Sequence, residues 1–147
     1  MVASVAGVAR YWINVVSRDH LQRGVEGGFM QANHGKPHML KRLSAGDYAV
    51  FYSPKTAYEG GQPLQAFTAI AQVGDDELYQ VEVGRDFMPW RRNVSFLTSQ
   101  EAPIKPLIDE LGFIEDKTHW GYRFRFGMFE IDRHDFELIA AAMHTDM

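Results

Sequence analysis

The sequence predicts an α+β fold, a small curved antiparallel β-barrel flanked by short helices. Short segments rich in aromatic and β-branched residues alternate with turn residues, which favours consecutive antiparallel strands in a curved sheet. Helical patterns in the same chain would close the ends or the open side of that barrel. With 147 residues, 46% of them hydrophobic, the chain is long enough for one domain with a real core. We therefore expect a single domain over residues 10–147 after a disordered N-terminal tail at residues 1–9.

Composition narrows the cellular setting. The chain has no cysteine, which excludes disulfides and thiolate metal sites and fits a reducing compartment. The opening residues 1–9 are small and apolar, but they lack a basic start and are too short for a signal peptide or a membrane span. We expect a cytoplasmic protein, most simply a monomer, that has no membrane partner.

Five segments have the composition of β-strands, because aromatic or β-branched residues dominate them. They are residues 10–16, 48–52, 64–73, 78–83 and 91–97. The turn residues at 74–76 predict that the third and fourth segments form a β-hairpin. Residues 120–127 place aromatic side chains at alternate positions with arginines between them, which predicts a further strand that continues through residues 128–131.

Capping residues and apolar spacing predict four short helices. Ser17 caps the first of them, and the glycines at 27–28 end it. The second covers residues 38–43, and the third covers residues 104–111, where apolar residues recur with the period of an amphipathic helix. Asp132 caps the last helix, which carries one apolar stripe.

The stretch at residues 27–36, GGFMQANHGK, is the first candidate for a binding site. Glycine, asparagine and histidine suit neither helix nor strand, and structured loops serve binding more often than packing. It is not a phosphate loop, because its glycine spacing is too long and Pro37 replaces the required Ser or Thr. His34 and His38 stand across a helix start without a third ligand nearby, so we expect no metal.

No motif supports catalysis. A Gly-x-Gly-x-x-Gly sequence after a strand is missing, so a dinucleotide-binding fold is not expected. Ser17, Asp19 and His20 contain the groups of a catalytic triad, but neighbours at a helix start point apart and cannot adopt its geometry. We expect a protein that is not an enzyme and uses no cofactor.

Aromatic side chains beside Gly, Pro, Arg or Lys indicate binding instead. Rings next to arginines suit base stacking and cation–π contacts, while the arginines can hold phosphates. The net charge is −4, yet residues 1–58 hold seven Lys/Arg against three Asp/Glu, whereas residues 59–147 hold eight against sixteen. A local basic surface on an acidic protein is therefore possible. The rings in question are Phe29, Tyr52, Phe87, Trp90 and Trp120, and the arginines are Arg91, Arg92, Arg123 and Arg125.

Eight motifs, in order along residues 10–143, resemble the EVE domain. Any one of them alone is a weak signal, but together they are specific. They are YWINVVS at 11–17, GFMQ at 28–31, HGK at 34–36, GD at 46–47, YSP at 52–54, FTAI at 67–70, RRNVSF at 91–96 and WGYRFR at 120–125.

This resemblance implies a PUA-like fold and kinship to YTH domains, which read methylated adenine in RNA. EVE proteins are regarded as readers of modified bases in DNA or RNA, most with no assigned catalysis. In YTH domains the base sits in an aromatic cage, and by position residues 29–31 supply one wall and Trp90 with Arg91 another. The first wall is a tryptophan in YTH domains and Phe29-Met30 here, so methyl-adenine specificity is not carried over.

The site expected from the residues and the resemblance has three kinds of groups. Hydrogen bonds to the base edge are assigned to Asn14, Ser17 and Gln31, and stacking to Phe29 and Trp90. Phosphate contacts are assigned to Lys36, Arg91, Arg92 and Arg123, with Met30, Tyr52 and Trp120 completing the pocket. The expected partner is DNA or RNA bearing a modified base. A small-molecule or nucleotide sensor, or a partner-binding module using the same pocket, remains the alternative.

Overall fold

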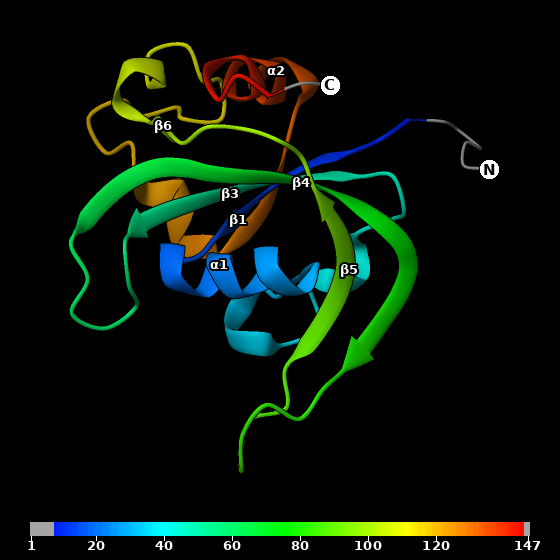
Figure 1. Ribbon diagram of the computed structural model, residues 1–147. Coiled ribbons are helices and arrows are strands. Elements are labelled where there is room, and N and C mark those ends of the chain that lie inside the picture. The colour runs from blue at the N-terminus through cyan, green and yellow to red at the C-terminus, as the bar shows by residue number, and fades with distance from the viewer. Residues whose placement is uncertain (1–7, 146–147) are drawn as a thin grey trace.

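Seven strands and two α-helices form within residues 8–145, the part of the chain that the computed structural model describes (Figure 1). The predicted tail at residues 1–9 lies mostly outside these described residues. The strands are β1 (Tyr11–Val15), β2 (Phe29–Met30), β3 (Tyr48–Lys55), β4 (Pro63–Gln80), β5 (Trp90–Phe96), β6 (Ala102–Pro103) and β7 (Met128–Ile131). The helices are α1 (Arg18–Gly27) and α2 (Arg133–Ala142), and short 3₁₀ turns η1 (Asn33–Gly35), η2 (Leu40–Arg42), η3 (Lys105–Leu107) and η4 (Tyr122–Phe126) complete the order.

The strands form one mixed, open sheet in the order β2-β5-β4-β3-β1-β7, with β6 beside β4. β1 and β3 run parallel, and the remaining pairs are antiparallel. The parallel pair is possible because α1 and two 3₁₀ turns carry the chain back between the strands. The predicted α+β class is confirmed. The prediction of a small antiparallel β-barrel is wrong, because β1 and β3 run parallel and because β2 and β7 end an open sheet.

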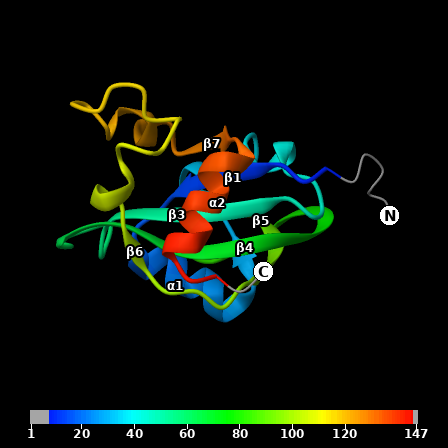
Figure 2. The ribbon, with the colours of Figure 1, turned by 90° about the horizontal axis from the view of Figure 1, so that it is seen from above.

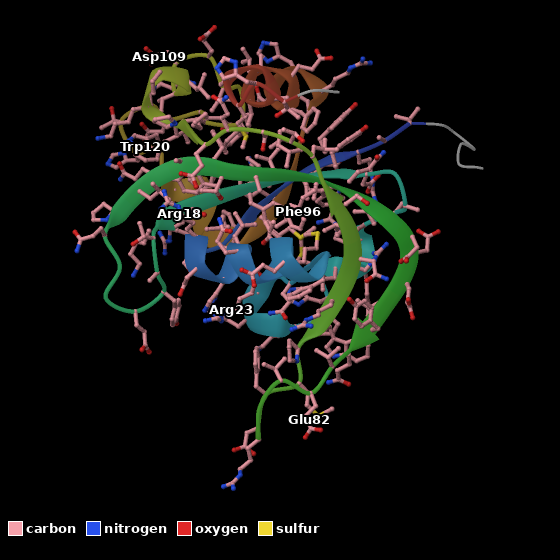
Figure 3. The ribbon with its side chains drawn as sticks, viewed as in Figure 1. Arg18, Arg23, Glu82, Phe96, Asp109 and Trp120 are labelled. Atoms are coloured by element: carbon pink, nitrogen blue, oxygen red, sulfur yellow. The ribbon has the colours of Figure 1, made fainter. Side chains whose placement is uncertain are left out.

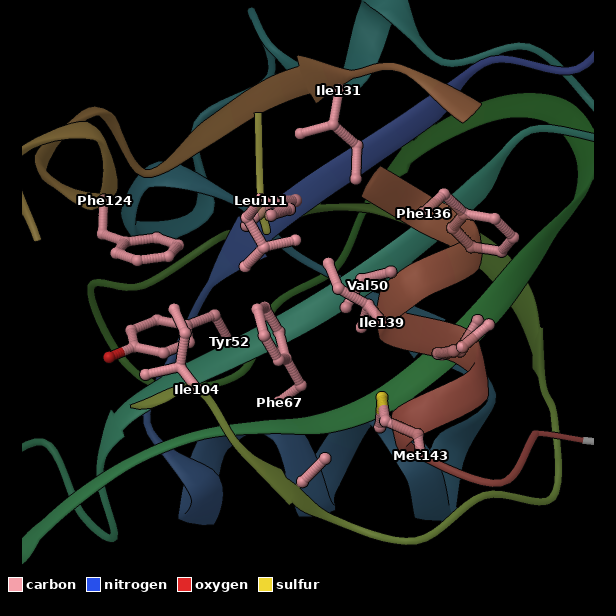
Figure 4. Packing of buried hydrophobic residues seen from close by; sticks show 14 of the residues in the cluster. Val50, Tyr52, Phe67, Ile104, Leu111, Phe124, Ile131, Phe136, Ile139 and Met143 are labelled. Atoms are coloured by element: carbon pink, nitrogen blue, oxygen red, sulfur yellow. The ribbon is translucent and has the colours of Figure 1, made fainter. Parts of the chain in front are cut away.

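Each face of the sheet has its own apolar core, as strand alternation requires. On β3, Ala49 and Phe51 face α1, while Val50 and Tyr52 face α2. The two helices cover opposite faces (Figures 1 and 2). We call the resulting clusters the α1-side core and the α2-side core; Figure 4 shows the latter, with Phe136 and other α2 residues packed on β3 and β4.

The predicted hairpin between residues 64–73 and 78–83 is wrong, because these segments belong to one long, bent strand, β4. Val73 pairs with Val94 and Leu78 with Arg92, so the intervening residues bulge out of the ladder. Arg92 donates a hydrogen bond to the Asp75 carbonyl at 2.8 Å, which satisfies a backbone group that the bulge removes from the ladder. The turn residues therefore bend β4 rather than end it.

Residues 81–89 join β4 to β5 as a protruding ribbon, which we call the arm (Figure 1). Val81 donates to the Pro89 carbonyl at 3.1 Å and Val83 to the Phe87 carbonyl at 3.0 Å. Its base is held by the Gln80 side chain, which donates to the Met88 carbonyl at 2.9 Å. The actual hairpin partner of residues 78–83 is therefore the segment that leads into β5.

Two further element predictions fail where short-range spacing is ambiguous. Residues 120–127 contain the 3₁₀ turn η4 instead of a strand, because alternate aromatics also place rings four apart, where they meet on a helix. Trp120 and Phe124 contact edge to face, with centroids 6.5 Å apart. Residues 104–111 form only η3 and further turns, although Ile104 and Leu111 are fully buried as the apolar pattern predicts. The helix predicted at 38–43 is likewise the 3₁₀ turn η2.

Candidate functional site

A cavity of about 700 Å³ opens on the α1 side of the sheet. Its walls come from segments far apart in the chain: α1, β2 with η1, the loop after β3, the arm, and the turn between η4 and β7. A volume of this size is typical of small-molecule sites. The floor is buried and largely apolar; it includes Asn14, Leu21, Met30, Phe51 and Phe124.

Positive charge dominates the lining of this pocket. Neither Asp nor Glu occurs among the described residues that line it, although the whole chain has a net charge of −4. Such a concentration of one sign in a cleft attracts ions of the opposite sign. The cationic and titratable lining residues are Arg23, Lys55, Arg91, Arg125, His20 and His34.

Arg91 is held as a flat platform in the pocket. Its guanidinium carbon lies 3.6 Å from the centroid of the Phe29 ring, and its Nε donates to Gln31 Oε1 at 2.7 Å. A Cβ on Gly27 would lie 2.5 Å from Cε2 of the Phe29 ring, so the backbone there packs closely against the ring. Phe29 is therefore packed between backbone and guanidinium, and it supports Arg91. A planar ligand can stack on Arg91 rather than on Phe29.

Asn14 brings a buried hydrogen-bond acceptor to the same wall. The side chain is 1% exposed, and its Nδ2 donates to the Gln31 carbonyl at 2.7 Å. That bond orients the amide and leaves Oδ1 as the free end. Within residues 8–145, Asn14 Oδ1 has no hydrogen-bond partner. Because an unpaired buried acceptor is costly, this atom favours a ligand with an N–H donor.

Three rings gather at the exposed mouth of the pocket. Tyr58 lies stacked on His20, with centroids 5.9 Å apart, and meets His34 edge to face at 6.0 Å. Tyr58 is 55% exposed, so these groups face solvent as well as the pocket. Lys55 joins them, because its Nζ donates to the Tyr58 carbonyl at 3.1 Å.

The turn that carries His34 is strained. Asn33 and His34 have φ angles of 49° and 60°, and Gly35 follows at 85°. Left-handed backbone costs a residue with a side chain roughly 1–2 kcal/mol. Gly127, with φ of 78°, makes room for this turn, since a Cβ there would collide with the Asn33 side chain. The strain is held by tertiary contacts and places His34 at the mouth.

Six of the twelve residues predicted for the site line this pocket. They come from β1, the start of α1, β2 and β5, and so the structure unites segments up to about eighty residues apart. These six are Asn14, Ser17, Phe29, Met30, Gln31 and Arg91. Ser17 precedes α1 as predicted, but its hydroxyl donates to Asp19 Oδ1 at 2.5 Å instead of accepting a backbone N–H of the helix.

Arg92 is not placed to contact phosphate. Its side chain is 2% exposed, and NH1 donates to the carbonyls of Leu40 and Leu43, both at 2.7 Å. Burial lowers the pKa of its guanidinium, against the charges of Asp76 and Asp75. Arg92 therefore binds η2 and the β4 bulge together, and the prediction that it neutralises a ligand is corrected.

The other predicted residues outside the pocket serve packing or lie elsewhere. Trp90 packs against the α1-side core, since residues 90, 92, 94 and 96 share the core-facing side of β5. Tyr52 stacks on Phe124 at 4.0 Å within the α2-side core (Figure 4), and burial raises its pKa. Trp120 lies beside that core, across the sheet from Arg23 (Figure 3). Arg123 covers the Phe129 ring at 4.6 Å, and Lys36 is exposed and does not line the pocket, although its neighbour Gly35 does.

Several lining residues were not predicted. His20 and Arg23 stand three apart on α1, a spacing that already places them on one helix face. Lys55 and Tyr58 lie between the predicted strands at residues 48–52 and 64–73, and no local sequence signal links that segment to α1. Asp19, one residue from His20, is the carboxylate beside this group. Burial raises its pKa, but hydrogen bonds from Ser17 and the His20 backbone and the nearby positive charges lower it overall.

One cluster of possible metal ligands occurs within residues 8–145, and it has a structural explanation. Asp132, His134 and Asp135 lie at the start of α2, where Asp132 Oδ1 accepts the Asp135 N–H at 2.9 Å as the predicted cap. Asp135 accepts the backbone N–H groups of Gly112 and Phe113 at 2.8 and 2.9 Å. Asp132 therefore caps α2, and Asp135 joins α2 to the loop at residues 112–113.

The sheet and its pocket define a small α+β protein whose α1-side cavity is lined, within residues 8–145, by cationic side chains and by no carboxylate. The EVE domain family model matches residues 10–142, and the chain belongs to the EVE domain family. Membership implies a PUA-like fold, here with an open sheet. None of the helices within residues 8–145 is long and apolar enough to cross a membrane.

Similar sequences cover nearly the whole chain, and a solved structure shares its fold. A UPF0310 protein of Mycolicibacterium vanbaalenii is 69% identical over 91% of this chain and 92% of its own length. A UPF0310 protein of Mycolicibacterium gilvum is 66% identical over 92% of this chain and 96% of its own length. The NMR structure of Rpa0253 from Rhodopseudomonas palustris shares the fold, with a TM-score of 0.57 and 15% identity over 92% of this chain and 94% of that one.

Proposed function

We propose that this protein is a non-catalytic nucleic-acid-binding module that reads a modified nucleobase in DNA or RNA. The observation that carries the proposal is the cationic pocket with no carboxylate among its described lining residues, in a chain whose net charge is −4. Nucleic acids are polyanions, and phosphate attraction supplies much of their affinity for proteins. Family membership supports the same class of ligand.

Recognition of the base is assigned to the wall formed by Asn14, Gln31 and Arg91. The guanidinium of Arg91, supported by Phe29, offers a flat cation on which a base can stack. Asn14 Oδ1 offers an acceptor, which suits an exocyclic amino group or a ring N–H of the base edge. A base enters such a pocket only when it is unpaired or flipped out of a duplex. Short single strands are therefore the proper first substrates.

The decisive experiment compares oligonucleotides that differ in one base. Fluorescence anisotropy is measured with single-stranded DNA and RNA that carry one modified base from a panel, and with the unmodified sequences. Because a stacked base contributes roughly 1–3 kcal/mol, Arg91→Gln is expected to weaken binding of the preferred oligonucleotide by about 5- to 150-fold. Affinity falls as salt rises, because phosphate contacts release counterions.

Arg123→Gln is the matched control. It removes the same charge from a guanidinium that also covers an aromatic ring, but outside the pocket. We expect its affinity to stay within about twofold of wild type, since base recognition does not use it. Mass spectrometry of the oligonucleotide after incubation tests the absence of catalysis, and the expected result is an unchanged mass.

Two outcomes contradict the proposal. Equal affinity for modified and unmodified sequences would exclude a reader of modified bases. Equal binding of a free modified nucleoside and of the oligonucleotide, with little salt dependence, would favour the alternative, a small-molecule or nucleotide sensor. The observation that favours this second candidate is the buried, largely apolar floor of the pocket, which is typical of small-molecule sites.

A further inference from the structure

The mouth of the pocket contains a second group of residues with a chemistry different from that of the base-facing wall. His20, Tyr58 and His34 form a contiguous set of rings, with neighbouring centroids 5.9 and 6.0 Å apart. They come from α1, the loop after β3 and η1, so only the folded chain brings them together. The base-facing wall offers a platform and an acceptor, whereas the mouth offers hydrogen-bond donors.

Charge around this set is positive and supplies several donors. Arg23 lies one turn after His20 on α1, and the Lys55 ammonium is fixed beside Tyr58 through the Tyr58 carbonyl. Both imidazoles become double donors when protonated, and the tyrosine hydroxyl adds another. The titratable and charged groups around the two imidazoles are Asp19, Arg23, Lys55, His38, Tyr58, Arg91 and Arg125.

Asp19 is the carboxylate in that set, and one of its oxygens is occupied by other donors. Asp19 Oδ1 accepts the Ser17 hydroxyl at 2.5 Å and the His20 backbone N–H at 2.8 Å. It therefore orders the start of α1 and does not pair with the His20 ring in any hydrogen bond of the described residues. His38 contacts the Asn33 amide at 3.4 Å, behind the turn that carries His34.

We propose that His20, Tyr58 and His34, with Arg23 and Lys55, form a phosphate subsite that selects a nucleotide over a nucleoside and binds more tightly as pH falls. This inference rests on the proposed function, because it assigns the phosphate attached to the recognised base to the mouth. Phosphate favours the charged form of a neighbouring imidazole, so binding takes up protons. Histidine is the side chain whose charge ordinarily changes near neutral pH, so the dependence is sought there.

The strained turn gives this subsite its geometry. Three successive residues with positive φ, at 49°, 60° and 85°, hold His34 against Tyr58. Such strain persists only where surrounding contacts maintain it, here including Gly127.

The experiment uses nucleoside 5′-monophosphates, the matching nucleosides and inorganic phosphate as probes of the whole chain. Titration calorimetry at about pH 6, 7 and 8 is expected to show that the monophosphates bind roughly tenfold tighter at the lowest pH than at the highest. Nucleosides are expected to show no such trend. NMR signals of the His20 and His34 rings are expected to titrate at higher pH with inorganic phosphate present.

The double variant His20→Gln/His34→Gln removes both titrating rings. It is expected to abolish the pH dependence of monophosphate binding while nucleoside affinity changes less than about twofold. His119→Gln is the control, because the His119 side chain is exposed and bonds only to Asp116 among the described residues. Circular dichroism establishes that each variant is folded, and the NMR titration of wild type needs no variant.

The outcomes separate this inference from the proposed function. Equal affinity for nucleosides and monophosphates at every pH, or unmoved signals of both histidines, would overturn the phosphate subsite while leaving the oligonucleotide comparison with Arg91→Gln intact. Conversely, pH-dependent monophosphate binding that disappears in the double variant, without preference for any modified base, supports the subsite and contradicts the reader.

Discussion

Arg92→Met separates a structural arginine from a ligand-binding one. The buried guanidinium donates to the carbonyls of Leu40, Leu43 and Asp75 at 2.7, 2.7 and 2.8 Å. Methionine keeps much of the apolar stem but leaves all three acceptors without this donor. At a net 1–1.5 kcal/mol for each bond, we expect the free energy of unfolding to fall by about 3–5 kcal/mol. For a chain of this length that lowers Tm by roughly 6–20 °C.

Urea denaturation, followed by tryptophan fluorescence, measures this loss of stability. If the variant and wild type have the same slope m of unfolding free energy against urea concentration, the shift of the midpoint gives the difference in stability. Arg92→Lys is expected to recover little of it, because an ammonium cannot reproduce the planar fork. Arg91→Met is the neighbouring control. It removes one side-chain hydrogen bond, to Gln31, so its stability should change by less than about 1.5 kcal/mol while its oligonucleotide affinity falls.

The two variants should therefore show opposite effects. Below its melting range, Arg92→Met should bind oligonucleotides as wild type does. If instead Arg92→Met were as stable as wild type and lost salt-dependent binding, Arg92 would be a phosphate ligand, and its placement beneath η2 and the β4 bulge would be refuted.

Three further predictions follow from packing and electrostatics. Trp90→Phe should leave oligonucleotide affinity within about twofold of wild type, since the ring packs against the α1-side core. A loss of affinity as large as that of Arg91→Gln, measured by anisotropy, would contradict this. Gly35→Ala should destabilise the protein by more than Gly46→Ala in paired melts, because both have φ near 90° but only at Gly35 would a Cβ collide with the arm, 2.7 Å away. Asp75→Asn should lower stability by about 1 kcal/mol at neutral pH, because a hydrogen bond from Asn93 lowers the pKa of Asp75. That contribution is present above the unfolded pKa near 3.8 and is lost as pH falls through the lower folded value, so wild type and variant should converge in acid; a constant gap in denaturation curves would refute it.

Local sequence signals predicted much of the backbone. The predicted strand at residues 10–16 matches β1 and that at residues 91–97 matches β5, each to within one residue at either end. The predicted strand at residues 48–52 covers the start of β3. Apolar composition marks these segments directly. Asp132 caps α2 as predicted, since a capping bond lies within one turn. By contrast, the residues at 74–76 bend β4 instead of ending it, because a distant arginine satisfies the bulge.

The candidate site shows the same division between local and long-range information. The wall at residues 29–31 and Asn14 were found, because the motif and the family resemblance mark them. Side chains alternate along a strand, so Arg92 lies on the same, buried face of β5 as Val94. This alternation can be read from the sequence, but the positive charge of Arg92 suggested a ligand contact instead. The meeting of His20 with Tyr58 depends on how α1 packs beside the loop after β3, and no spacing within either segment encodes that contact.

The support of Arg91 by Phe29 and Gln31 has a consequence for the thermodynamics of association. An exposed arginine samples many rotamers, and immobilising such a side chain on binding costs about 0.5–1.5 kcal/mol. Here the guanidinium is already immobilised, at 3.6 Å from the ring centroid and 2.7 Å from the amide oxygen. That entropy is lost when the chain folds. A ligand therefore meets a rigid surface, and the free energy of its contacts with Arg91 goes to affinity rather than to ordering the side chain.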